Sequence, residues 1–238
     1  SNRMALLVTR GNDAAGDKPE DPGALKIFGY KDGVLTNRAS IAPGRGYGFG
    51  PRHLDFHPAG PWVYVSLERQ NKLNVFKLDG DTVAAEPLFR KETLIDTVHV
   101  NPRQLVGTLH VHPNGRYVYV ANRAYGTTNV GGKPVFSGGE NNLAVFAIDP
   151  RTGEPTLVQN IDTRGLYART FAIDPSGRML VIAHVLQLAV RDGSGFSSVP
   201  ANLSVFRIGD DGKLSFVRKY DVDVGSEAMF WMGMVSLP

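Results

Sequence analysis

Four charged residues stand at the ends of segments whose patterns predict β-strands. Arg52 begins one such segment, and Glu68 ends the segment that follows it. Arg123 ends, and Arg169 begins, corresponding segments further along the chain. Because the start of a strand lies beside the end of its antiparallel hairpin partner, we expect all four side chains on one face. One carboxylate among three guanidinium groups suits a small anionic substrate, since guanidinium binds carboxylate or phosphate through two parallel hydrogen bonds.

Two interpretations of this cluster are open. In the catalytic one, Glu68 is a general base for water or for a carbon acid, and the arginines stabilise an oxyanion as it develops. In the structural one, Arg52 and Glu68 form an ion pair that holds the end of a hairpin. The residues alone favour the structural interpretation.

Histidines supply weaker candidates. His53 follows Arg52 and is a candidate for proton transfer or substrate binding, against the alternative of a strand histidine that hydrogen-bonds a neighbouring loop. His110 and His112 are two residues apart, which places both imidazoles on one strand face. No Asp, Glu or third His completes a metal-ligand set locally. We therefore predict no metal site and no cofactor, and keep His110 as a substrate-binding candidate.

The elements that must position these residues form an internal repeat. Three segments share a short strand, a Pro-x-Gly turn and a second strand rich in Val, Tyr, Ile or Leu, at residues 52–68, 108–123 and 169–184. Proline ends the strand and glycine tolerates the positive φ of a tight hairpin. A third strand containing Val-Phe follows each pair, at residues 72–79, 142–149 and 202–209, and a fourth follows a polar turn, as at 212–220.

The repeat predicts an all-β fold, a β-propeller of four-stranded antiparallel blades. The turn prolines Pro58, Pro113 and Pro175 are 55 and 62 residues apart, and four strands in a unit of roughly this length are typical of propeller blades. A β-helix or a sandwich does not explain the constant strand order. We expect one domain, with blades at about 1–50, 51–105, 106–167 and 168–228, and insertions on one face at 97–105 and 126–141.

The two ends of the chain predict an incomplete arc of about four blades. Residues 1–10 match the second strand of a blade without its innermost strand, and 229–238 are expected to form a closing inner strand. Rings need about four or more complete blades, so further blades are expected upstream. Open sheet edges predict possible self-association of this piece.

Composition and charge limit the kinds of site and partner that the protein can have. Among 238 residues there is no Cys, which excludes disulfides, thiolate metal sites and a cysteine nucleophile. The net charge of +3 comes from scattered basic residues, which argues against nucleic acid. No apolar run is long enough to cross a bilayer, and no secretory signal opens the sequence. We expect a cytoplasmic protein with a small anionic substrate and neither nucleic acid nor membrane as partner.

Several motifs resemble the seven-bladed lactonase family, which includes a bacterial type of 6-phosphogluconolactonase and fungal carboxymuconate lactonizing enzymes. They are Gly50-Pro-Arg-His53 with Phe56-His-Pro58 and Val65-Ser-Leu-Glu68, Leu109-His-Val-His-Pro113 with Asn122-Arg123, Ala168-Arg-Thr-Phe171, and Met229-Phe-Trp-Met-Gly233. Two departures stand out. The chain has Leu67-Glu68 where the family often has Asn-Glu, and a family histidine of an inner strand would lie upstream of Ser1.

The resemblance implies a lactonase-family enzyme that hydrolyses or forms a small anionic lactone, and it favours the catalytic interpretation of the cluster. Glu68, Arg52 and His53 would then be catalytic. Arg123, Arg169 and His110 would bind substrate. The alternative is a non-catalytic propeller scaffold that binds a partner through its face. A deep axial cleft lined by the arginines and Glu68 would favour the enzyme.

Overall fold

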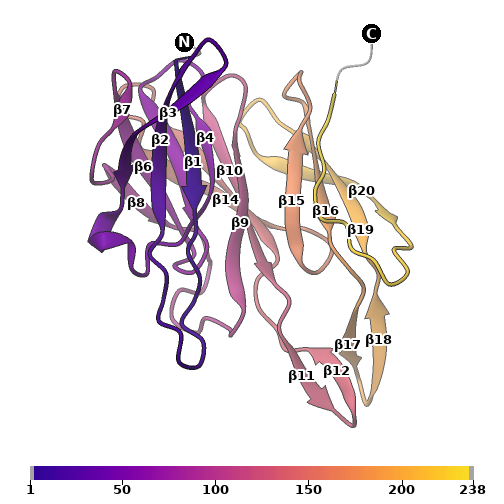
Figure 1. Cartoon of the computed structure of the whole chain (residues 1–238). Helices are drawn as coiled ribbons and strands as arrows, with labels where there is room; N and C mark the ends of the chain where they lie inside the picture. Colours follow the sequence, from indigo (N-terminus) through magenta and orange to yellow (C-terminus); the bar gives the residue numbers. More distant parts are fainter. Residues whose placement is uncertain (1–2, 236–238) are drawn as a thin grey trace.

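The computed structural model describes residues 3–235, which form antiparallel sheets with one short 3-10 helix at Pro43–Gly46 (Figure 1). The first sheet has three strands, in the order β1 (Met4–Thr9), β2 (Ala24–Lys31) and β3 (Val34–Ile41). The second contains β4 (Pro51–Phe56), β5 (Trp62–Leu67) and β6 (Lys72–Asp79), with β7 (Thr82–Val83) and β8 (Phe89–Glu92) both paired to β6.

The third and fourth sheets repeat this order. The third contains β9 (Gln104–Val111), β10 (Tyr117–Ala124), β13 (Asn142–Ile148) and β14 (Pro155–Asp162). The fourth contains β15 (Ala168–Ile173), β16 (Met179–His184), β19 (Asn202–Ile208) and β20 (Leu214–Asp221). The predicted fold class, an incomplete arc of antiparallel propeller blades, is confirmed; we call the sheets blades 1 to 4 in chain order.

Successive blades pack face to face through apolar side chains. Each of three clusters of buried residues joins two neighbouring blades, with Val65, Val120 and Ile182 among the fully buried members. Strands rich in Val, Ile and Leu suit this arrangement, because a propeller blade is covered on both faces by its neighbours. The core therefore runs along the arc and holds the strand ends of adjacent blades at fixed relative positions.

Two tyrosines link one blade to the next. Tyr64 and Tyr119 are fully buried, and their hydroxyl groups donate to the carbonyls of Gly153 and Gly212, each at 2.8 Å. Both carbonyls lie in the outer turn of the following blade. Each hydroxyl therefore bonds a second strand to the neighbouring blade.

Two extra hairpins extend from the same side of blades 3 and 4 (Figure 1). One comprises β11 (Thr127–Val130) and β12 (Lys133–Phe136), and it lies in the insertion expected at 126–141. The other, β17 (Leu188–Asp192) with β18 (Gly195–Val199), was not predicted from the sequence. None of its strand residues is buried, so these strands do not contribute to the core as the blade strands do.

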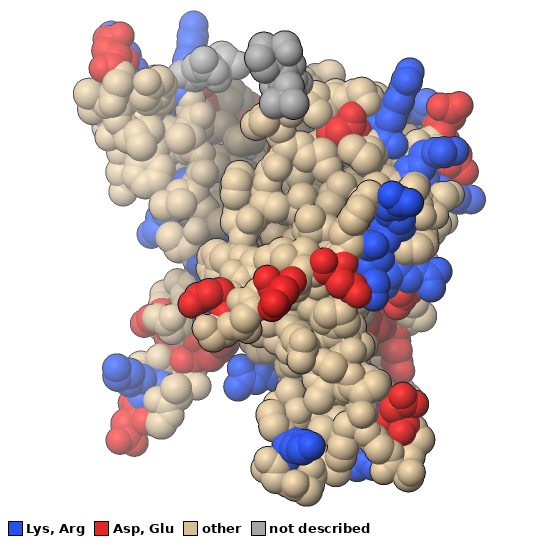
Figure 2. All heavy atoms as spheres, turned by 90° about the vertical axis from the view of Figure 1, so that its right-hand side faces the viewer, with Lys and Arg blue, Asp and Glu red and all other residues tan. Residues whose placement is uncertain are grey.

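The outermost strand of blade 4 is more exposed. Only the first residue of β20, Leu214, is buried. Figure 2 views the molecule from this side and shows several acidic side chains in a row across its middle, with a group of basic side chains to their right. Within residues 3–235 no helix is long and apolar enough to cross a membrane.

The strand expected at the start of the chain is present, and the one expected at its end is not formed by the described residues. β1 pairs with β2 as β5 pairs with β6, so it is a second strand, as expected, and in the described chain it is paired on one side only. Self-association through this edge stays a prediction. The closing inner strand expected at 229–238 is not formed by residues 229–235, whose one backbone bond to a strand end runs from Met229 N–H to the Val185 carbonyl at 2.9 Å. Strand geometry requires a ladder of such bonds; residues 236–238 lie outside the described range.

Candidate functional site

Strand register aligns the four blades residue by residue. In the second strand of each blade one residue pairs with the leucine of the third strand: Val8 with Leu25, Ser66 with Leu73, Ala121 with Leu143, and Ala183 with Leu203. Two residues further along, where the second strand ends, stand Arg10, Glu68, Arg123 and Val185. Equivalent backbone positions in neighbouring blades therefore carry an arginine, a glutamate and an arginine in succession.

β-Bulges position two further arginines. In β4 the pairing skips from Pro51 to His53, so Arg52 is the extra residue of the bulge. In β15 it skips from Ala168 to Thr170, so Arg169 is the extra residue. A bulge redirects the side chain it carries, and bulges are common beside active sites.

Blade 3 has Gly107 within the corresponding irregularity of β9. A Cβ atom at Gly107 would lie 3.3 Å from the Arg169 carbonyl oxygen and 3.5 Å from Cδ of Arg123. The missing side chain thus leaves room for Arg123, which reaches toward Glu68 from the neighbouring strand.

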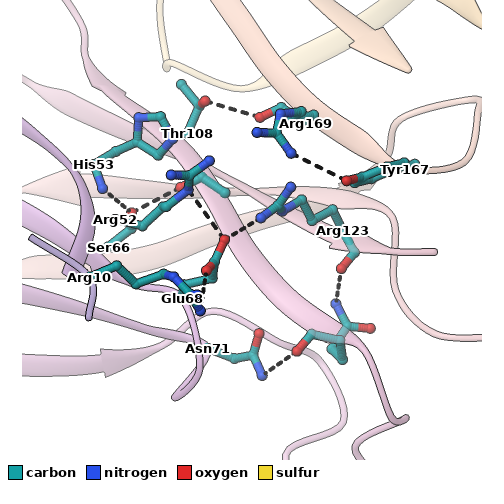
Figure 3. Close-up of polar contacts among 12 residues, drawn as sticks. Arg10, Arg52, His53, Ser66, Glu68, Asn71, Thr108, Arg123, Tyr167 and Arg169 are labelled. Carbon is teal, nitrogen blue, oxygen red and sulfur yellow. Dashed lines mark hydrogen bonds and ion pairs between the residues drawn. The ribbon is translucent and has the colours of Figure 1, made fainter. Parts of the chain in front are cut away.

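Glu68 is the centre of the cluster (Figure 3). Its Oε1 lies 3.2 Å from Nε of Arg52 and also contacts Nη2 of Arg123, while its Oε2 lies 3.3 Å from Nη1 of Arg10. Glu68 is 4% exposed. Three arginines from three blades thus surround one carboxylate. Because the site is buried, the attraction between each arginine and Glu68 is stronger than it would be at an exposed surface.

These side chains line a cleft of about 740 Å³ that is rich in arginine. Its lining comprises Arg10, Asp13, Arg52, Glu68, Arg69, Arg103, Leu105, Arg123, Tyr125, Tyr167 and Arg169. All four residues of the predicted cluster contribute to it. His53 and His110 are not among the lining residues.

Several of the cleft's cationic donors are buried without partners. Arg123 is 3% exposed, and its Nε and Nη1 have no hydrogen-bond partner among the described residues. Burial lowers the pKa of Arg52, an effect that Glu68 opposes and Arg123 reinforces. Unpaired buried donors beside a cleft are available to an anionic ligand.

Neither candidate histidine is among the ion-pair partners of Glu68. The backbone N–H of His53 donates to Oγ of Ser66 at 3.2 Å. Burial, and then the positive charge of Arg52, lowers the pKa of His53 to about 3, so its imidazole is neutral at neutral pH. His110 has its Nδ1 3.5 Å from an Asp55 carboxylate oxygen and places its ring edge-to-face with Phe171.

Sequence reasoning missed Arg10, Arg103, Tyr125 and Tyr167 as cleft residues. For Arg10 a signal existed, because Val8-Thr9-Arg10 has the same register as Ser66-Leu67-Glu68. Arg103 and Tyr125 lie beside insertions that follow no repeat. Among residues 3–235 no group of three or more His, Asp or Glu side chains is arranged to hold a metal ion.

Comparisons with known proteins identify the family of this chain. The model of the family described as "Lactonase, 7-bladed beta-propeller" matches residues 24–190. A 6-phosphogluconolactonase of Bacillus subtilis is 33% identical over 170 residues, which are 69% of this chain and 42% of that protein. A 6-phosphogluconolactonase of Serratia proteamaculans is 27% identical over 84% of this chain and 52% of its own length. The chain spans about half or less of the length of these relatives.

Solved structures show the same fold. A protein from Lactobacillus plantarum superimposes with a TM-score of 0.61 at 24% identity, over 94% of this chain and 57% of its own. The periplasmic gluconolactonase PpgL of Pseudomonas aeruginosa superimposes with a TM-score of 0.59 at 22% identity, over 87% of this chain and 52% of its own. Together with the family match over most of its length, these findings show that the chain belongs to the lactonase family of seven-bladed β-propellers.

Proposed function

We propose that this protein is a lactonase that hydrolyses a small anionic sugar lactone of the 6-phosphogluconolactone type. The observation that carries the proposal is the cleft in which one buried carboxylate, Glu68, is surrounded by arginines with unused donors. The names of the relatives from Bacillus subtilis and Serratia proteamaculans support the substrate class.

In the proposed reaction Glu68 is the general base. The ionised carboxylate takes a proton from a water molecule, and the oxygen of that water attacks the lactone carbonyl carbon. The carbonyl oxygen becomes an oxyanion, which Arg52 and Arg123 stabilise with hydrogen bonds that gain strength as charge develops. The bond from the carbonyl carbon to the ring oxygen then breaks, the proton passes to that oxygen, and the open-chain acid is released.

Arg169 binds substrate charge in this proposal, and the histidines have indirect roles. His53 is neutral at neutral pH, so it would influence Arg52 through packing more than through charge. His110, which is paired with Asp55 and lies edge-to-face with Phe171, would act on substrate only indirectly.

Two alternatives use the same residues differently. A muconate-type lactonizing enzyme would use Glu68 to move a proton at carbon, and the arginines would bind the carboxylates of its substrate. In a non-catalytic scaffold Glu68 would only hold the strand ends together through its ion pairs. Its contacts with three arginines are compatible with that role as well. We also propose a cytoplasmic location, on the absence of Cys, although PpgL is named as periplasmic.

A substrate panel tests these alternatives. The intact protein is assayed by acid release with 6-phosphogluconolactone, unphosphorylated δ-gluconolactone and a carboxymuconolactone, each corrected for spontaneous hydrolysis. We expect the phosphorylated lactone to have the highest kcat/KM. Faster conversion of the carboxymuconolactone would favour the lactonizing enzyme. If the protein accelerates the hydrolysis of none of these lactones, the scaffold is favoured.

A further inference from the structure

The charges of the cleft are unevenly balanced. Arg10, Arg52 and Arg123 share Glu68. Arg69 contacts both Asp13 and Glu20, with its Nη1 2.7 Å from the Glu20 carboxylate.

Arg103 and Arg169 also line the cleft, but neither has a carboxylate oxygen within 4.0 Å among residues 3–235. Positive charge therefore accumulates at the part of the cleft that these two arginines line. Uncompensated guanidinium groups at a cleft wall attract an anion from solution.

A stacked pair of tyrosines lies beside these two arginines, and the guanidinium of Arg169 also lies 4.1 Å from the Phe230 ring centroid. The rings of Tyr125 and Tyr167 are 4.2 Å apart between centroids and nearly parallel, at 18°. The guanidinium of Arg103 lies 5.9 Å from the Tyr125 ring centroid, and Nη1 of Arg169 donates to the Tyr167 hydroxyl at 3.2 Å. Figure 3 shows Arg169 directed at Tyr167, with Arg123 on the side toward Glu68. The pair thus holds both arginines on one wall of the cleft.

The backbone gives an independent reason to assign a role to this wall. Arg103 and Tyr167 both have positive φ, at 67° and 60°, a conformation disfavoured for residues other than glycine. Tyr167 is the blade 4 equivalent of Gly50, since the carbonyl of each accepts a bond from the first backbone N–H beyond the second strand. Blade 2 meets the same backbone requirement with glycine, at a φ of 51°. A tyrosine at this position is expected where its side chain serves the site.

We propose that the phosphate of a phosphorylated lactone binds to a subsite formed by Arg103 and Arg169, which are held by Tyr125 and Tyr167. This inference rests on the proposed lactonase function. A phosphate monoester carries close to two negative charges and three acceptor oxygens, which match two guanidinium groups and a nearby phenol. Arg123 lies between this wall and Glu68, with its guanidinium 5.6 Å from the Tyr167 ring and two of its nitrogens unpaired. The lactone carbonyl would then lie toward Glu68 and the phosphate toward Arg103. The subsite makes the enzyme specific for phosphorylated lactones.

The decisive experiment compares Arg103→Met with Arg151→Met. Arg151 carries the same charge outside this cleft, and its side chain is 87% exposed. For each variant kcat/KM is measured with 6-phosphogluconolactone and with unphosphorylated δ-gluconolactone. We expect Arg103→Met to lower the preference for the phosphorylated lactone roughly 10- to 100-fold, chiefly through KM, because a charge-assisted hydrogen bond is lost. Arg151→Met should keep the wild-type preference.

A binding measurement separates failure of this inference from failure of the proposed function. Calorimetric titration with inorganic phosphate and with 6-phosphogluconate requires no turnover. Weaker binding of both by Arg103→Met, but not by Arg151→Met, would support the subsite even if the protein hydrolyses no lactone. An equal loss with both lactones, or unchanged binding of both anions by Arg103→Met, would overturn it. Tyr167→Phe, which removes only the hydroxyl that Arg169 donates to, should give a smaller loss in the same direction.

Discussion

Glu68 and Arg123 occupy the same backbone position in adjacent blades, and their side chains meet in a direct ion pair. A repeat fold brings equivalent positions of successive blades together around one axis. Opposite charges at one such position therefore meet without any special loop. Arg10 extends the pattern into blade 1, and Val185 ends it in blade 4. The bulged Arg52 completes the set of arginines around the carboxylate.

The role of Glu68 leads to the first prediction. Glu68→Gln should lower kcat roughly 10²- to 10⁴-fold, because the amide cannot accept the proton of the attacking water. Since the amide also leaves three arginines without their anion, Glu68→Asp provides a second variant that keeps the charge but moves it. We expect Glu68→Asp to retain more stability in urea denaturation and still to lose turnover. Glu86→Gln, at an exposed position, is the control. An unchanged kcat in Glu68→Gln would reject the general-base role.

The space at Gly107 leads to the second prediction. Gly107→Val should destabilise the fold by about 1–3 kcal/mol through overpacking, because carbonyl oxygens of Arg169 and Ala121 would lie 3.3 and 3.4 Å from the new Cβ. Displacement of Arg123 from Glu68 should also lower kcat/KM. Gly195→Val, whose Cβ would meet only the Asp192 carbonyl oxygen at 3.7 Å, is the matched control. Equal effects of the two substitutions on activity would show that Gly107 does not make room for Arg123.

The blade strands could be predicted from the sequence because their signals are local. In blades 2 to 4 proline and glycine mark the inner turn, and the third strands share a Val-Phe pair. Placement of Arg52, Glu68, Arg123 and Arg169 followed from hairpin geometry alone. The hairpin at 188–199 gave no comparable signal, since it has no Pro-x-Gly turn and none of its strand residues is buried.

Side-chain direction near the axis was harder to predict. Alternation along a strand sets which face a residue occupies, and one extra residue reverses it. The bulges that contain Arg52 and Arg169 are backbone irregularities without a sequence signature. His53 follows one of them, and it lies outside the cleft lining although its neighbour Arg52 lies within it. The side chains of Arg103 and Tyr125 reach the cleft from positions next to insertions, which no repeat pattern can place.

The inter-blade tyrosines lead to the third prediction. Tyr64→Phe should lower the free energy of unfolding by about 1–3 kcal/mol, because the buried Gly153 carbonyl would lose its 2.8 Å donor. Tyr119→Phe should act in the same way through Gly212. Urea denaturation measures both changes. Tyr47→Phe, at a side chain that is 57% exposed, should change stability by less than about 0.5 kcal/mol. A loss no larger than this control would mean that the hydroxyl bonds do not hold the blades together.

The fourth prediction concerns acid stability and depends on His184. This side chain is fully buried, with Nε2 2.9 Å from the Thr163 hydroxyl oxygen and Nδ1 without a partner among the described residues. Burial lowers the pKa of His184 to about 4, whereas an unfolded chain gives histidine a pKa of about 6.5. Between these values the unfolded state binds a proton that the folded state does not. The contribution of His184 to the free energy of unfolding is therefore fully present above pH 6.5 and is lost as the pH falls toward 4.

At pH 5 the expected loss from His184 is about 2 kcal/mol, since each pKa unit corresponds to about 1.4 kcal/mol. His53 should add in the same direction, because its pKa of about 3 is also below the unfolded value. Urea denaturation at pH 7.5 and pH 5, at constant ionic strength, measures the combined loss. His184→Gln should weaken the pH dependence whatever its effect on absolute stability, while His99→Gln, at a side chain that is 84% exposed, should preserve it. An NMR titration in which the His184 imidazole becomes protonated near pH 6.5 in the folded protein would contradict the prediction, as would an unchanged pH dependence in His184→Gln.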